Sequence, residues 1–267
     1  MWAILCAALT GACAYALAPT LRVPALLRAN YARREVPTAG GVCLLLAFAL
    51  VVGCAVATNF DAQALAPDVL LLVAGFGLLG LFDDVVGTHA ARGWRGHLAA
   101  LRRAQLTSGV VKLVGGVTLT WIVVHPFGRT TAERLVCVVI VAGSANIANL
   151  LDLAPARTTK AAALVLVVLA VARGGVYSGH AVNWFVAGAV GLAPFELRES
   201  LMLGDTGANA IGAAVGYELL WAMSHTQRLA IAVLVVAVNV AGELVSFSAV
   251  IDRVAPLRAL DRLGRRG

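Results

Sequence analysis

Charged residues are scarce in this sequence of 267 residues. They make up 13% of the chain, against about 25% in a typical soluble domain, whereas hydrophobic residues reach 60% and the mean hydropathy is +0.87. A soluble fold exposes too much surface to water to be this apolar, and disordered chains are kept unfolded by low hydrophobicity. Both classes are excluded, and the composition predicts a polytopic membrane protein.

Paired cysteines, internal repeats, low-complexity segments and interdomain linkers are also absent. The five cysteines lie in apolar stretches without a CxxC pair, which is typical of small buried hydrophobic residues. No basic residue precedes the first apolar segment, although ACAYALA at 12–18 resembles a signal-peptidase site. Because a signal peptide carries its positive charge before the apolar region, we expect this first helix to be retained. We expect one integral membrane domain over 1–267, ending in a basic cytosolic tail over 252–267.

Long apolar runs predict nine membrane spans in an all-α helix bundle, since a spanning helix needs about 20 mostly apolar residues. The runs lie at 1–19, 40–58, 67–82, 110–127, 134–151, 161–176, 181–195, 205–223 and 229–250. With nine spans, 17 of the 21 lysines and arginines fall on one side, in segments 20–39, 83–112, 152–160, 196–204 and 251–267. Basic residues gather in cytoplasmic loops. We therefore expect a plasma-membrane protein with its N-terminus outside and its C-terminus cytosolic, and we interpret the net charge of +7 as orientation rather than nucleic-acid binding.

Two acidic motifs lie at predicted cytosolic helix ends. Asp83 and Asp84 close the third span; adjacent carboxylates on a helix point about 100° apart, so one suits a base and the other a metal or a basic partner. A charged stop to the helix is an equal alternative. Asp205 opens the eighth span between Gly204 and Gly207, where a helix N-terminus attracts phosphate and a carboxylate favours a bridging divalent cation. The alternative is an aspartate that caps the helix.

Two further motifs are polar rather than acidic. Asn146, Asn149 and Asp152 are spaced by three residues, so they form one helical stripe that offers oxygen ligands, or donors to a base or sugar edge. The stripe suits interhelical hydrogen bonding equally well. The segment RREVPTAGG, which contains Arg34 and Thr38, suits a loop that folds closely against a ligand. Positive-inside anchoring before a helix start is the commoner use of such a segment.

All four motifs fall at the cytosolic face under an orientation derived only from lysine and arginine. Four unrelated structural features would not be expected to coincide in this way, so the pattern predicts one composite site. Carboxylates, amides, glycine-rich turns and arginines suit Mg²⁺-assisted chemistry on a phosphorylated substrate with a lipid partner. Glu218 and Glu243 fall within spans and outside any motif, and they stay unassigned.

The chain resembles the polyprenyl-phosphate N-acetylhexosamine-1-phosphate transferases, which include phospho-N-acetylmuramoyl-pentapeptide transferase and the undecaprenyl-phosphate GlcNAc-1-phosphate transferases. The family's motifs match in order over residues 1 to about 250. They are Pro37-Thr38-Ala39-Gly40-Gly41, Asp83-Asp84, Asn146/Asn149/Asp152 and Gly204-Asp205-Thr206-Gly207.

The resemblance implies that a polyprenyl phosphate attacks the sugar-bearing phosphoryl group of a UDP-sugar and releases UMP. It places Mg²⁺, or Mn²⁺ in its stead, on Asp205 and Asn149, with Asp83, Asp84 and Asp152 in the catalytic group. Seven further residues are expected to contact substrate, among them the lysine that the acidic residues would orient. These are Asn146, Lys112, Gly204, Thr206, Arg34, Thr38 and Arg157. The resemblance also allows a homodimer.

Two departures from the family leave alternatives open. Leu153 stands where the family usually has glycine, and residues 251–267 hold neither the family's histidine-rich motif nor its tenth helix. His89 and His97, in a predicted cytosolic loop, are candidates for the missing function, although exposed loop histidines are mostly inert. One alternative is therefore a catalytically degenerate relative that binds lipid carrier or partner proteins. The other is a transporter, which would be expected to have broken helices near the midplane.

Overall fold

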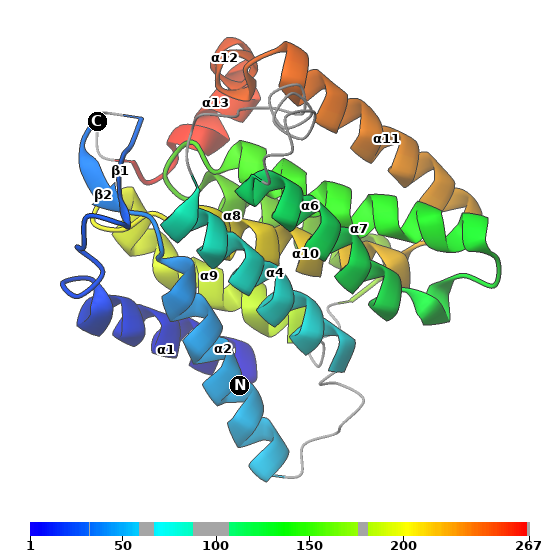
Figure 1. Ribbon diagram of the computed structural model, residues 1–267, viewed down its shortest axis with the longest axis horizontal. Coiled ribbons are helices and arrows are strands. Elements are labelled where there is room, and N and C mark those ends of the chain that lie inside the picture. The colour runs from blue at the N-terminus through cyan, green and yellow to red at the C-terminus, as the bar shows by residue number, and fades with distance from the viewer. Residues whose placement is uncertain (32, 59–66, 88–106, 176–180, 266–267) are drawn as a thin grey trace.

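A computed structural model of the chain describes residues 1–31, 33–58, 67–87, 107–175 and 181–265 (Figure 1). These residues form eleven α-helices, one 3₁₀ turn and one two-stranded ribbon, which confirms the all-α class. The nine longer helices are α1 (Trp2–Leu17), α2 (Gly41–Ala57), α4 (Pro67–Val86), α6 (Ser108–Val123), α7 (Thr131–Leu151), α8 (Arg157–Ala172), α9 (Ala181–Leu197), α10 (Gly204–Ala222) and α11 (His225–Leu244).

The two-stranded ribbon and the two short helices lie near one end of the bundle, and a 3₁₀ turn lies at the other. Strands β1 (Leu27–Ala29) and β2 (Glu35–Pro37) pair antiparallel, with Leu27 opposite Pro37 and Ala29 opposite Glu35. Two short helices, α12 (Phe247–Arg253) and α13 (Ala255–Arg262), follow α11 within and beside the segment expected to be a basic tail. The 3₁₀ turn η1 (His125–Phe127) joins α6 to α7.

The nine longer helices coincide with the nine apolar runs, but the prediction of nine spans is wrong. Within the described ranges, only α4, α7 and α11 are long and apolar enough to cross a membrane. Helices α1, α2, α6 and α9 are apolar but only 16 or 17 residues long. At 1.5 Å per residue they fall short of a hydrocarbon core of about 30 Å. Helices α8 and α10 begin with polar or charged residues, which lowers their apolar content.

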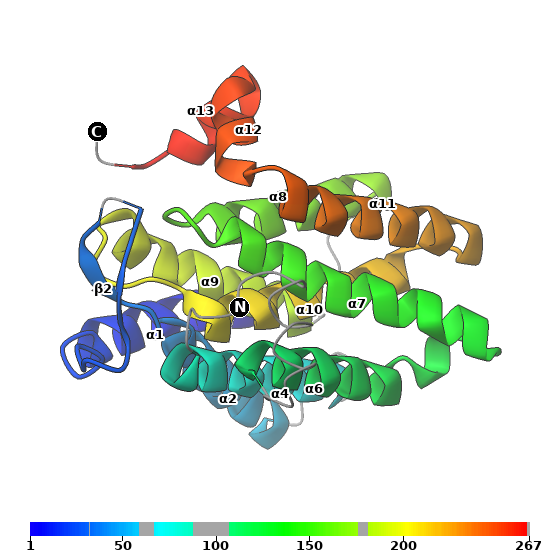
Figure 2. The same cartoon turned by 45° about the horizontal axis from the view of Figure 1, so that its top comes forward.

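Helix α10 is the centre of the bundle. It contacts α2, α4, α7, α8 and α9, and fifteen of its nineteen residues are buried (Figures 1 and 2). Its sequence GDTGANAIGAAVG is rich in small residues, which let helix backbones approach closely. Helix α11 lies at the periphery instead: it packs on α7 and buries only Ala232 and Val235. The core therefore forms around α10, and both its ends are held by several neighbours.

At Gly80, helix α4 packs closely against the start of α10. A Cβ at Gly80 would overlap the backbone of Asp205 and Thr206, which cannot move aside as a flexible side chain could. Gly80→Ala is therefore expected to lower the free energy of unfolding by about 1–3 kcal/mol, the usual cost of overpacking. Thermal unfolding in detergent measures this. Gly53→Ala is the matched control, because nothing lies within 4 Å of a Cβ at Gly53 in α2. Equal midpoints for the two variants would contradict the tight α4–α10 contact.

Candidate active site

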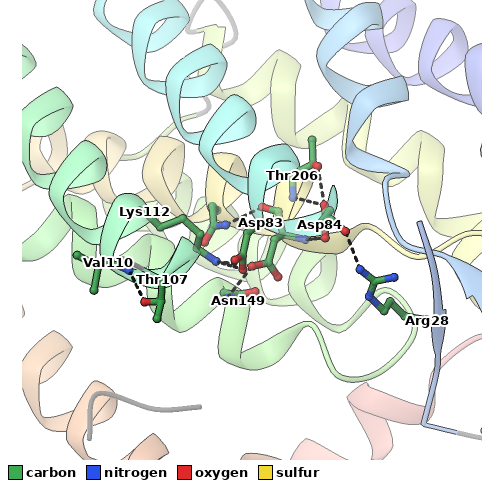
Figure 3. A network of polar contacts seen from close by, with 10 residues as sticks. Arg28, Asp83, Asp84, Thr107, Val110, Lys112, Asn149 and Thr206 are labelled. Atoms are coloured by element: carbon green, nitrogen blue, oxygen red, sulfur yellow. Dashed lines mark hydrogen bonds and ion pairs between the residues drawn. The ribbon is translucent and has the colours of Figure 1, made fainter. Parts of the chain in front are cut away.

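A lysine and two carboxylates meet where four helix ends converge (Figure 3). Lys112 Nζ, near the start of α6, donates to Asp83 Oδ2 at 3.0 Å and forms a second ion pair with Asp205 Oδ2. Asn149 Nδ2, from the last turn of α7, lies 3.5 Å from the same Asp205 oxygen. The side chains of Lys112, Asp83 and Asp205 keep 18–24% of their surface exposed, so a ligand can reach the cluster.

The start of α6 is fixed locally. Thr107 caps this helix, and its hydroxyl accepts the backbone N–H of Val110 at 3.3 Å. This cap satisfies one of the N–H groups that a helix start leaves unpaired and sets where the helix begins. Lys112 is thereby held one turn into α6, facing the ends of α4 and α10 (Figure 3).

Asp84 has a different position from its neighbour Asp83. Its carboxylate accepts the backbone N–H groups of Asp205 and Thr206, at 3.1 and 2.9 Å, and the Thr206 hydroxyl at 2.6 Å. These bonds cap the start of α10 from another helix, and a negative charge at a helix N-terminus is favourable. Asp84 is 9% exposed, and its two oxygens are occupied by these donors. The structure therefore places Asp84 as a clamp on α10.

The ribbon β1–β2 holds the other side of the same helix start. Arg28 Nη2 donates to the backbone oxygen of Asp84 at 2.9 Å, and the N–H groups of Gly40 and Gly41 donate to the backbone of Met202 and Leu203. Gly204 has φ +71°, a left-handed conformation that favours glycine, and a Cβ there would overlap the carbonyl of Thr38.

Thr38 is buried, and its hydroxyl donates to the carbonyl of Leu26 at 3.1 Å. The segment PTAGG therefore packs on the Gly204–Thr206 turn. Two motifs that are far apart in the sequence are in contact at this end of the bundle.

An acidic hollow lies beside this cluster. Asp152, Glu196 and Glu199 contribute carboxylates to its lining. Glu199 is already well satisfied: it accepts from Tyr31 at 2.8 Å and Asn30 at 2.9 Å. Glu196 is 4% exposed, and its Oε2 has no hydrogen-bond partner within the described residues. The hollow therefore offers carboxylate oxygens as hydrogen-bond acceptors, and it lies next to the end of α7, where Asp152 is.

Burial raises the pKa of Asp152 well above its usual range. The carboxylates of Glu196, Asp205 and Asp84 raise this pKa further, and a backbone hydrogen bond from Gly204 opposes them. Asp152 follows the last residue of α7. Ionised Asp152 therefore carries a cost in the folded state that the unfolded chain does not have.

Asp152→Asn is expected to stabilise the protein in a pH-dependent way. Because folding raises the pKa of Asp152, ionisation of this residue lowers the free energy of unfolding. This loss of stability is absent below about pH 4, grows as pH rises through the folded pKa, and is complete above it. The variant should therefore gain stability at neutral pH and lose that gain in acid. Thermal unfolding midpoints from pH 4 to pH 8 measure this. Asp252→Asn, at a 61% exposed side chain, is the control, and a pH-independent gain for Asp152→Asn would contradict the burial cost.

Three predicted site residues point to partners outside the cluster. Asn146 Nδ2 donates to Asn239 Oδ1 of α11 at 2.6 Å, so this member of the stripe bonds across helices. Arg157 forms a bidentate ion pair with Asp261 of α13, at 2.8 and 3.1 Å. Arg34 has a 73% exposed side chain and pairs with Glu199 at 3.3 Å.

Glu218 pairs with Arg173 at 2.9 Å near the far end of α10. Glu243 lies in the last turn of α11. His89 and His97 lie outside the described residues.

Several residues of this region carry no signal in the sequence. Glu196 and Asp261 are single carboxylates outside any motif, and Asn239 is a single amide within the apolar part of α11. An intramembrane amide is a recognised signal for a helix partner, so Asn239 could have been singled out with Asn146. Nothing in the local sequence links Arg157 to Asp261, which lies 104 residues further on.

The cluster has donors that suit a hard divalent cation. Among the described residues, no three or more His, Cys, Asp or Glu side chains gather as a metal site. Mg²⁺, however, usually takes one or two carboxylates plus substrate phosphates and water. The carboxylates of Asp83 and Asp205 share one cation, Lys112, and Asn149 can turn its amide oxygen toward them. These residues fit Mg²⁺ together with a phosphorylated ligand.

No protein-family model matches the chain, and no curated protein matches its sequence.

Proposed function

We propose that the protein transfers a sugar-1-phosphate from a UDP-activated amino sugar to a polyprenyl phosphate, with release of UMP. The observation that carries the proposal is the cluster of Asp83, Asp205, Asn149 and Lys112, to which three of the four motifs contribute. The fourth motif, PTAGG, packs on the same helix start. This arrangement supports the resemblance to the polyprenyl-phosphate N-acetylhexosamine-1-phosphate transferases, and it suits phosphoryl chemistry through oxygen ligands and a fixed cation.

Asp83, Asp205 and Asn149 would hold Mg²⁺. When bound there, Mg²⁺ supplies charge neutralisation for the diphosphate of the sugar nucleotide. The N-terminus of α10 adds the positive end of the helix dipole, which favours phosphate, while its N–H groups at Asp205 and Thr206 are already bonded to Asp84. Asp84 and Arg28 keep that helix start in place, so they act by positioning.

Lys112 would bind phosphate oxygens. Its ammonium group pairs with both carboxylates, so the arrival of a metal would free it to contact the substrate. The second pKa of a phosphate monoester is near 6, so most of the lipid phosphate is already ionised at pH 7. Catalysis therefore rests mainly on positioning and charge neutralisation rather than on proton removal by Asp83.

The cluster would face the cytosol. All five segments that hold most of the basic residues contribute side chains to this end of the bundle. One side chain from each segment in turn is Arg28, Lys112, Arg157, Glu199 and Asp261. The few basic residues at the far end include Arg173 and Arg228, which bond to Glu218 and to backbone carbonyls. The asymmetry favours a plasma-membrane protein with its site at the cytosolic interface.

One observation favours a second function, that of a catalytically inactive relative that binds lipid carrier or a partner protein. Lys112 already forms an ion pair with each of the two carboxylates, so the cluster is held together without a metal. This alternative expects binding of polyprenyl phosphate without turnover of any UDP-sugar.

Metal binding distinguishes the two functions without an activity assay. Mn²⁺, which gives an electron paramagnetic resonance signal, is expected to bind the purified protein at one site in the presence of UMP and to be released by EDTA. Asp205→Asn should weaken this binding, because it removes one of two carboxylates, and Asp252→Asn should leave it unchanged. Absence of stoichiometric Mn²⁺ binding to the unmodified protein would overturn the metal-dependent proposal.

A further inference from the structure

Exposed apolar side chains continue from the long helix α11 into the two short helices beyond it. On α11 they belong to a helix that is long and apolar enough to cross a membrane. The sequence of exposed residues runs Val233, Leu234, Val240 and Leu244, then Val250, Val254, Leu257, Leu260 and Leu263, at 37–74% exposure. Figures 1 and 2 show α12 and α13 following the end of α11 and standing out to one side of the bundle. Apolar side chains at such a position require a cover other than water.

The same two helices carry outward-facing positive charge. Arg253 and Arg262 are exposed and Arg258 is half-buried, while the exposed carboxylate nearby is Asp252. The other carboxylate, Asp261, is 6% exposed and faces inward. The outer surface therefore combines leucines with arginines, which is the composition of helices that lie in a membrane interface.

A buried ion pair holds α13 in this position. The Asp261 carboxylate accepts two hydrogen bonds from the Arg157 guanidinium and also pairs with Arg265. Lys160 Nζ donates to the backbone oxygen of Asp261 at 2.8 Å. Arg157 also donates to Ser248 of α12 at 2.9 Å. The polar side of α13 is thereby used against α8, so the exposed leucines are directed elsewhere. The helix is organised to present its apolar edge before any partner arrives.

We propose that α12 and α13 form a foot that rests on the anionic surface of the membrane. Leu257 and Leu260 enter the boundary between headgroups and acyl chains, and Arg253 and Arg262 contact anionic headgroups. The membrane is the occupant favoured here, because these exposed apolar residues follow directly in sequence on those of α11, which is apolar enough to cross a membrane, and because the arginines complement anionic lipid. A second copy of the chain, whose net charge is also +7, complements those arginines less well than anionic lipid does. This proposed membrane contact does not depend on the proposed transferase function.

The contact is tested in nanodiscs that hold one copy of the full chain. A fluorescent non-canonical residue replaces Leu263, which is 65% exposed, and bromine-labelled lipids report its depth by quenching. The same residue at Leu234 of α11 calibrates deep quenching, and at the exposed Glu35 of β2 it calibrates water. We expect shallow quenching at position 263, stronger with phosphatidylglycerol than with phosphatidylcholine and weakened by salt.

Charge removal gives the decisive comparison. In phosphatidylglycerol, some copies of α12 and α13 contact the membrane and the others do not, and fluorescence lifetimes measure the two populations. Arg253→Gln and Arg262→Gln are each expected to lower the ratio of contacting to non-contacting copies by about fivefold. Arg129→Gln, at an exposed arginine before α7, is the matched control and should change nothing. Quenching at 263 no greater than at 35 would overturn the proposal. So would quenching or shielding that appears only in nanodiscs holding two copies, which would assign the surface to dimerisation.

Discussion

Replacing Asp205 with asparagine is expected to lower UMP release from a UDP-sugar by about 100- to 1000-fold, the usual cost of removing one preorganised electrostatic group. Asp205 lies at the start of α10 and pairs with Lys112, within reach of Asn149. The substitution keeps the size of the side chain and removes its charge. Initial rates of UMP release by the purified variant, with undecaprenyl phosphate and Mg²⁺, measure the effect.

The fold should survive this change. Asp84 still receives the backbone N–H groups that hold the start of α10, and Lys112 still has Asp83 as its partner. Thermal unfolding of Asp205→Asn checks this, and Asp252→Asn is the charge-matched control with full activity expected. Full activity in Asp205→Asn would remove Asp205 from the proposed mechanism.

Asp261→Ala is expected to have the largest effect on stability. It leaves Arg157, a 7% exposed guanidinium at the start of α8, without its bidentate partner. Breaking a buried ion pair from one side costs about 3–5 kcal/mol, because the remaining charge is buried and uncompensated. The positive end of the α8 dipole adds to that cost. Because α13 can detach from α8, we expect the loss to appear first as faster amide hydrogen exchange in Ala255–Arg262.

Asp252 offers the matched comparison for that experiment. It also pairs with an arginine, Arg262, but at 3.8 Å and with both side chains more than 60% exposed. Such surface pairs contribute about 0–1 kcal/mol. Equal exchange rates in Asp261→Ala and Asp252→Ala would show that the Arg157–Asp261 pair does not hold the C-terminal helices.

The positions of the longer helices could be predicted from the sequence, but their ends could not. Apolar runs located the nine longer helices, because a run of apolar residues is a strong helix signal in this class of chain. The count of spans failed because apolar content does not report where a helix ends: α1 and α6 end at Leu17 and Val123, short of the needed length. The polar start of α10 was likewise counted as membrane-spanning, although it is covered by other helices.

Individual side-chain partners were harder to predict. The spacing of Asn146, Asn149 and Asp152 indicated a common stripe, but the stripe turns toward two neighbours. Asn149 lies beside Asp205, whereas Asn146 bonds to Asn239 of α11. Spacing along a helix places side chains on one face and says nothing about which neighbour that face meets.

The partners of Asp83 and Asp84 could not be predicted from the sequence either. Asp83 and Asp84 are adjacent, and the 100° between them sends one to Lys112 and the other to the backbone of α10. The sequence suggested two different roles without showing which residue had which. Arg157 was expected to contact substrate, but it is held by Asp261 through a contact that depends on the fold of the C-terminal helices.

The measurement that tests the proposed function most directly is UMP release by the purified chain. Nanodiscs containing undecaprenyl phosphate are incubated with Mg²⁺ and a panel of UDP-sugars, and UMP is quantified. We expect release from at least one UDP-amino sugar, dependent on both the lipid phosphate and the metal, together with a lipid-linked sugar diphosphate. Tight binding of undecaprenyl phosphate with no UMP released from any UDP-sugar would contradict the proposed transferase and support the non-catalytic alternative.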